Sequence, residues 1–104
     1  MIRFLALFVF LSILHDNVFA GANDRPETSE EVKKLVNEAY EIFNNNPQAG
    51  IRKIEEIRAF CISKKDSAGI FSTYYNQGIF YYKMEKMDSA SYVFNQSLQL
   101  ANRF

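Results

Sequence analysis

The stretch that decides the fold runs from residue 71 to residue 104 and reads FSTYYNQGIFYYKMEKMDSASYVFNQSLQLANRF. Its small and aromatic residues recur at helical spacing: Tyr74, Gly78 and Tyr81 in its first half, Ala90 and Phe94 in its second. Aromatic-rich segments also favour β-strands, so a strand pair is the alternative. The aromatic segment from Phe71 to Tyr82 lacks the period-two alternation and the turn residues of a hairpin, which favours a helix.

Three- and four-residue spacing of apolar residues continues upstream, so we expect four helices after residue 27. Each expected helix has a residue that could accept a hydrogen bond from its first turn. These expected caps are Thr28 with Glu31 in a capping box, Asn46 before Pro47, Asp66 with Ser67, and Asp88. The third helix is expected from Ala68 to Glu85, with Gly78 in its middle. Glycine in a helix costs about 1 kcal/mol relative to alanine, which suggests that a neighbouring helix backbone approaches it closely.

The set Tyr74, Gly78, Tyr81, Ala90 and Phe94 resembles the signature of one tetratricopeptide repeat, a helical hairpin of about 34 residues. The resemblance is clear over residues 68–104, and residues 28–67 resemble a degenerate earlier copy. It implies an all-α fold of two antiparallel helical hairpins, a fragment of a tetratricopeptide-like α-solenoid. Residues 28–104 would form this helical domain.

Repeats of this kind bind other proteins, and the first helix of each pair lines their concave side. The resemblance therefore implies a protein or peptide partner bound by the third helix, through Ser72, Tyr75, Ile79, Tyr82 and Lys83. The other interpretation is that Tyr75 and Ile79 only pack against the preceding helix pair. The chain also resembles exported bacterial repeat arrays that precede signalling modules. The alternative function is thus the N-terminal sensory portion of a truncated bacterial signalling regulator.

The first 20 residues have the pattern of a secretory signal peptide. A basic start is followed by an apolar run from Phe4 to Leu14 and by small residues before the expected cleavage after Ala20. Cleavage after Ala22 also fits. A permanent membrane helix needs about 20 continuous apolar residues, and this run is shorter. We therefore expect an exported protein, periplasmic or secreted, without stable membrane insertion, whose residues 21–27 form a flexible lead-in.

Composition argues against several other functions. Lys and Arg number 12, and so do Asp and Glu, so no net charge points to nucleic acid. The single His lies in the expected leader, which leaves no imidazole for a catalytic pair or a metal site. Cys61 is in step with Ile54 and Ile57, as a small buried residue would be, although an intermolecular disulfide or a reactive thiol is the minority interpretation. We expect no enzyme, no cofactor and no metal.

Two repeats are fewer than the three or so that usually make an array stable. We therefore expect that the chain either belongs to a longer array or covers the apolar face of its uncapped C-terminal helix by self-association.

Overall fold

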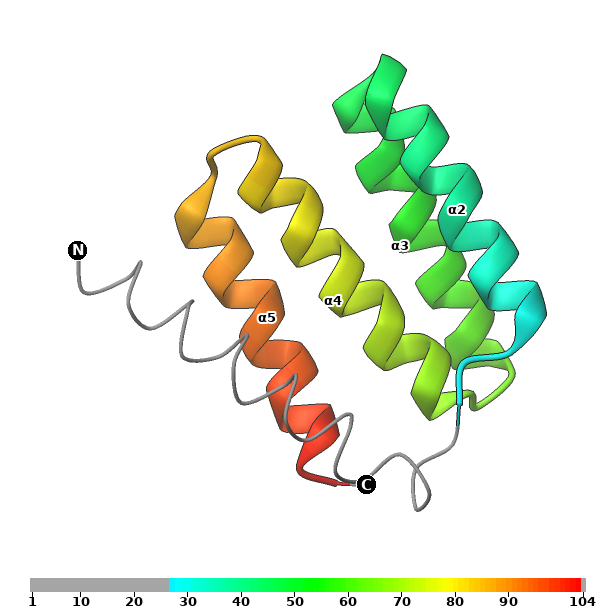
Figure 1. The fold of residues 1–104 in the computed structure, drawn as a ribbon. Coiled ribbons are helices and arrows are strands. Elements are labelled where there is room, and N and C mark those ends of the chain that lie inside the picture. Colours follow the sequence, from blue (N-terminus) through cyan, green and yellow to red (C-terminus); the bar gives the residue numbers. More distant parts are fainter. Residues whose placement is uncertain (1–26, 104) are drawn as a thin grey trace.

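The computed structural model describes residues 27–103, and this part of the chain is all-α. Four helices follow one another: α2 (Glu30–Asn45), α3 (Pro47–Ser63), α4 (Ser67–Lys83) and α5 (Met87–Ala101). Each helix packs against the next, and α2 also contacts α4 (Figure 1). No strand occurs between residues 27 and 103, so helices are confirmed over the strand pair. The expected signal peptide, both cleavage sites and residues 21–26 of the lead-in lie outside the described residues.

Two of the four expected caps are confirmed. The side-chain oxygen of Asn46 accepts a hydrogen bond from the amide of Ala49 at 3.2 Å, and Pro47 begins α3. The Asp66 carboxylate accepts one from the amide of Gly69 at 2.9 Å, so α4 begins at Ser67. Because both oxygens satisfy amides that have no partner within the helix, they fix where α3 and α4 start.

The other two expected caps are wrong. The hydroxyl of Ser29, one residue after the expected Thr28, accepts from the amide of Val32 at 3.2 Å. Helix α5 begins at Met87 with no side-chain cap, and Asp88 lies inside its first turn. The preceding turn ends at Lys86, two residues before Asp88, so α5 starts two residues earlier than expected.

The connections are short. Asn46 alone links α2 to α3, whereas three residues link α3 to α4 and α4 to α5. In each three-residue connection the middle residue has a left-handed backbone, with φ 55° at Lys65 and 60° at Glu85. Left-handed residues commonly end helices, where glycine is preferred, so Lys65 and Glu85 hold these turns at some conformational cost.

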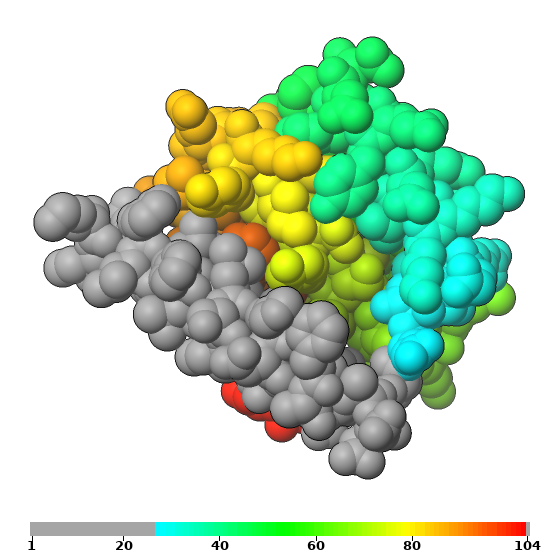
Figure 2. Space-filling view, viewed as in Figure 1, coloured from blue at the N-terminus to red at the C-terminus, as the bar shows by residue number. Residues whose placement is uncertain are grey.

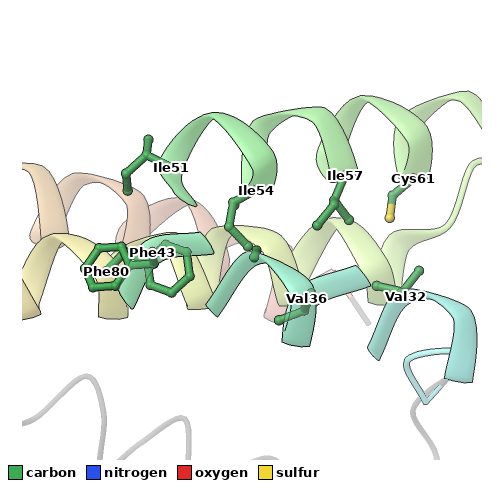
Figure 3. Close-up of a cluster of buried hydrophobic side chains, with 9 residues drawn as sticks. Val32, Val36, Phe43, Ile51, Ile54, Ile57, Cys61 and Phe80 are labelled. Atoms are coloured by element: carbon green, nitrogen blue, oxygen red, sulfur yellow. The ribbon is translucent and has the colours of Figure 1, made fainter. Parts of the chain in front are cut away.

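The main core lies between α2, α3 and α4 (Figure 3). It contains Val32, Val36, Ala39, Phe43, Ile51, Ile54, Ile57, Cys61 and Phe80. The Phe80 ring stacks on the Phe43 ring, with centroids 4.3 Å apart, and meets the Tyr40 ring edge-on at 4.7 Å. Phe80 is the buried residue that α4 contributes to this cluster, so its ring contacts join the second half of the chain to the first.

A smaller core joins α4 to α5 around the buried Ala90 and Phe94. A Cβ atom built on Gly78 would lie 2.5 Å from Cε1 of Phe94, so the close neighbour of this glycine is an aromatic ring and not the expected helix backbone. Backbone approach occurs instead between α2 and α3, where a Cβ on Gly50 would lie 2.7 Å from the Cα of Phe43. Both glycines therefore allow tight helix packing.

Candidate functional site

Helix α4 presents two opposite sides, because successive residues of a helix are rotated by about 100°. One side lies next to α2, and we call this surface the α2–α4 face. In Figure 2 the side chains of α2 (cyan to green) lie beside those of α4 (yellow). The α2–α4 face comprises Tyr40 of α2 and Ser72, Tyr75, Asn76, Ile79, Tyr82 and Lys83 of α4. The opposite side of α4 carries Ile70, Tyr74, Gln77 and Tyr81, and it lines a groove described below.

All five predicted partner-binding residues lie on the α2–α4 face. Tyr82 and Lys83 are exposed, Tyr82 with 42% of its surface accessible, whereas Ser72, Tyr75 and Ile79 are half-buried. The end of α4 therefore offers the most accessible part of this face.

A hydrogen-bond network crosses the α2–α4 face. The Tyr40 hydroxyl donates to the side-chain oxygen of Asn76 at 2.6 Å, and the Asn76 amide donates to the Ser72 carbonyl at 2.7 Å. Burial raises the pKa of the Tyr40 phenol, and the nearby Tyr75 phenol raises that pKa further. The Lys83 ammonium lies 5.3 Å from the centre of the Tyr40 ring, within cation–π range. Ser72 is thus held within the network, and sequence patterns alone did not indicate Tyr40 or Asn76.

The aromatic ring of Tyr75 is engaged with α5. It stacks with Phe71 at a centroid distance of 6.4 Å and meets the Phe94 ring at 5.8 Å. Ile79 packs against the same cluster. The alternative interpretation placed both residues against the preceding helix pair, but the structure places them against the following helix.

A groove runs along α5 on the opposite side of α4, and we call it the α5 groove. Two hollows of about 490 Å³ and about 210 Å³ form it, and Tyr74 lines both. The larger hollow is lined by Glu55 and Arg58 of α3, Tyr74, Gln77 and Tyr81 of α4, and Asp88, Ser89, Tyr92 and Val93 of α5. The smaller one is lined by Ile70, Tyr74, Gln96, Gln99, Leu100 and Arg103. The groove therefore follows α5 from its first turn to the residues just beyond its end.

Several contacts hold the Arg58 side chain in the α5 groove. Its guanidinium carbon lies 3.8 Å from the centre of the Tyr74 ring. Its Nε donates to the Thr73 hydroxyl at 3.1 Å, and a terminal nitrogen donates to the side-chain oxygen of Gln77. Burial lowers the pKa of Arg58, while Tyr74, Glu55 and Tyr81 act in the opposite direction. The side chain is consequently held in one orientation.

Sequence reasoning missed Arg58 and Gln77 as a pair. Gln77 is a polar residue next to the proposed signature residue Gly78, and only 3% of its surface is exposed in the structure. A buried amide needs a partner, and Arg58 supplies the donor. Nothing in the spacing of the two residues, which lie on different helices, indicated that they would meet.

The thiol of Cys61 is buried between α2, α3 and α4, as expected for a small core residue. Burial raises the pKa of this thiol, and the Asp66 and Glu31 carboxylates add to the rise. The thiolate is therefore disfavoured. Among residues 27–103 no group of three His, Cys, Asp or Glu side chains could hold a metal ion. None of the helices in the same range is both long and apolar enough to cross a membrane.

Comparison with known proteins gives no relative: no family model, no curated protein and no solved structure matches the chain significantly. The resemblance to tetratricopeptide repeats therefore depends on the residues themselves. Four of the five signature residues, Gly78, Tyr81, Ala90 and Phe94, lie where α4 packs against α5. The fifth, Tyr74, lines the α5 groove, and its ring packs against the guanidinium of Arg58.

Proposed function

We propose that the chain is an exported, non-enzymatic interaction module of tetratricopeptide type, which binds a protein or peptide partner on its α2–α4 face. In this proposal α2 with α3 and α4 with α5 form two antiparallel helical hairpins of a short α-solenoid. The α2–α4 face would be the concave side of that solenoid.

The packing at small residues supports the proposed repeat. Gly50 allows close approach in the α2–α3 pair, and Gly78 admits the Phe94 ring in the α4–α5 pair. Ala39 and Ala90 are fully buried. Paired helices that meet at small residues are what the repeat requires, and short connections favour a reversal of direction between consecutive helices.

The observation that carries the binding proposal is the exposed pair Tyr82 and Lys83, of which Lys83 lies over the ring of the hydrogen-bonded Tyr40. Tyrosine offers a large contact area and a hydroxyl at low entropic cost, and it is common at binding hot spots. The network below holds Tyr40 and Asn76 in place, so a partner would meet a surface that is already ordered.

Capture of partners from an extract of the native host tests this proposal. The variant Tyr82→Ala with Lys83→Ala changes the two exposed residues and leaves Tyr75, whose ring packs against Phe94, untouched. Ile62→Ala is the matched control, since Ile62 is an exposed apolar residue of α3. We expect the double variant to lose the partner that wild type and control retain. If all three proteins recover the partner equally, the α2–α4 face is not its binding site.

Export has its own test. Cell fractionation should place the chain outside the cytoplasm, and the N-terminus of the recovered protein should be Gly21 or Asn23. The alternative of a truncated signalling regulator predicts instead that the reading frame continues into an apolar span, which sequencing of the gene would reveal.

Self-association through α5 remains a further proposal. Among the described helices α5 packs only against α4. Its exposed residues are Asp88, Tyr92, Asn95 and Gln99, and three of these four are polar, as on helices that cap repeat arrays. Tyr92 is the exposed large apolar residue of α5, so Tyr92→Ala should convert such a dimer to a monomer in sedimentation.

A further inference from the structure

The α5 groove has features of a second binding surface, and these do not depend on the α2–α4 face. Its lining residues on α4 point away from that face, because Tyr74 and Tyr81 are rotated by roughly half a turn from Ile79 and Lys83. A variant on one side of α4 can therefore be tested without altering the other side.

Arg58 is the centre of this surface. A guanidinium has five N–H donors, and Arg58 gives two of them to neutral oxygens, those of Thr73 and Gln77. The Glu55 carboxylate acts on Arg58 electrostatically, but among residues 27–103 no carboxylate forms an ion pair with it. The Tyr74 ring supports one face of the guanidinium, which fixes its plane. Arg58 is thus a half-buried cation with unused donors in a fixed plane, the arrangement that suits a carboxylate.

The α5 groove carries charges of both signs. Glu55 and Asp88 line the hollow where α5 begins, Arg58 lines the same hollow beside Tyr74, and Arg103 lines the hollow at the other end. Tyr74, beneath Arg58, lies where the two hollows meet. A segment that follows the groove would therefore meet acidic groups first and then two arginines. Such polarity favours a ligand whose charges have the reverse order.

Size and exposure suit an extended peptide. Helix α5 has 15 residues and is therefore about 22 Å long. An extended peptide of about seven residues has the same length. Tyr92 has 66% of its surface exposed and lines the same groove. Tyrosine and arginine are the residue types most often found at binding hot spots.

We propose that the α5 groove binds an extended peptide segment of a partner protein, and that Arg58 holds an acidic side chain of that segment. The basic end of the segment would lie near Glu55 and Asp88. The carboxylate would accept from the unused N–H groups of Arg58 and add a counter-charge to the half-buried guanidinium.

The test is an NMR titration of the 15N-labelled full chain with a defined probe, the peptide acetyl-Gly-Lys-Ser-Ser-Glu-Glu-Gly-amide. The Nε–H of Arg58 is a direct reporter because it is hydrogen-bonded and half-buried. The control peptide has glutamine in place of both glutamates. We expect a saturable shift of the Arg58 Nε–H and of Tyr92 with the acidic peptide only. An equal response to the glutamine peptide, or no saturable response to either, would overturn the proposal.

Two variants separate recognition from folding. Arg58→Lys keeps the charge but loses the planar fork, and it should weaken binding of the acidic peptide by about tenfold or more. Tyr92→Ala changes an exposed side chain and leaves Arg58 intact, and it should weaken binding by a smaller factor. Ile62→Ala should bind as wild type does. Unchanged affinity in both groove variants would contradict the proposed site even if the acidic peptide binds.

Discussion

The ring of Phe94 occupies the space that a side chain at Gly78 would need. A Cβ atom at Gly78 would lie 2.5 Å from Cε1, 2.6 Å from Cδ1 and 2.8 Å from Cζ of that ring. All three distances are shorter than carbon atoms can approach without a shift of the neighbour. The contact between Gly78 and Phe94 therefore sets how closely α4 and α5 pack.

We predict that Gly78→Leu destabilises the chain by about 3 kcal/mol or more, because the new side chain overlaps the Phe94 ring. The gain in helix propensity, about 1 kcal/mol, is too small to compensate. Thermal unfolding followed by circular dichroism measures the effect. Asn95→Leu adds the same side chain at an exposed position of α5 and should leave the melting temperature nearly unchanged. An unchanged melting temperature in Gly78→Leu would refute the packing described.

Phe80 should be the most costly aromatic residue to remove. Its ring is fully buried and stacks on Phe43 across the contact between α4 and α2. Phe80→Ala should lower the free energy of unfolding by about 3–5 kcal/mol. Tyr82→Ala, an exposed truncation on the same helix, should cost about 0.5 kcal/mol or less. Urea denaturation of both variants checks this, and similar losses would show that Phe80 does not join the two halves of the chain.

Arg58 and Gln77 should be energetically coupled. Gln77→Leu removes the acceptor of a half-buried guanidinium, so we expect a loss of about 1–3 kcal/mol. Arg58→Met leaves the buried amide of Gln77 without its donor and should also destabilise. The double variant replaces both polar groups and should cost less than the sum of the two single changes. Additive losses in a double-mutant cycle would contradict the contact.

Stability should fall at alkaline pH through two groups. The pKa of the Cys61 thiol and that of the Tyr40 phenol are both raised in the folded chain, chiefly by burial. Since the folded state holds these protons more tightly, its advantage is complete below the unfolded pKa values and is lost as pH rises above them. Cys61→Ala should remove the loss that begins near about pH 8.5 and keep the loss that begins near about pH 10. A profile that Cys61→Ala leaves unaltered would show that the thiol is not responsible.

The helices and part of their limits could be predicted from sequence, and long-range pairings could not. Asn46 with Pro47 and Asp66 were predicted correctly because a cap acts on amides only three residues away. The choice between Thr28 and Ser29 failed because adjacent hydroxyl residues are chemically equivalent as caps. Asp88 failed because the left-handed turn at Glu85 decides where α5 begins.

In the candidate site, too, local features could be predicted from sequence and contacts between helices could not. Tyr75, Ile79 and Tyr82 share one side of α4, which follows from the geometry of one helix alone. Helical spacing could not show that Tyr75 packs against Phe94 or that Asn76 bonds to Tyr40, because those contacts arise from the packing of separate helices.

Site-specific photo-crosslinking tests whether the α2–α4 face binds a partner. A photoreactive phenylalanine analogue is placed at position 82 on that face or at position 62 on α3, two positions with exposed apolar side chains. After irradiation in the native host, we expect a discrete adduct with a second protein at position 82 and none at position 62. Adducts of equal yield at both positions, or an adduct at position 62 alone, would contradict it.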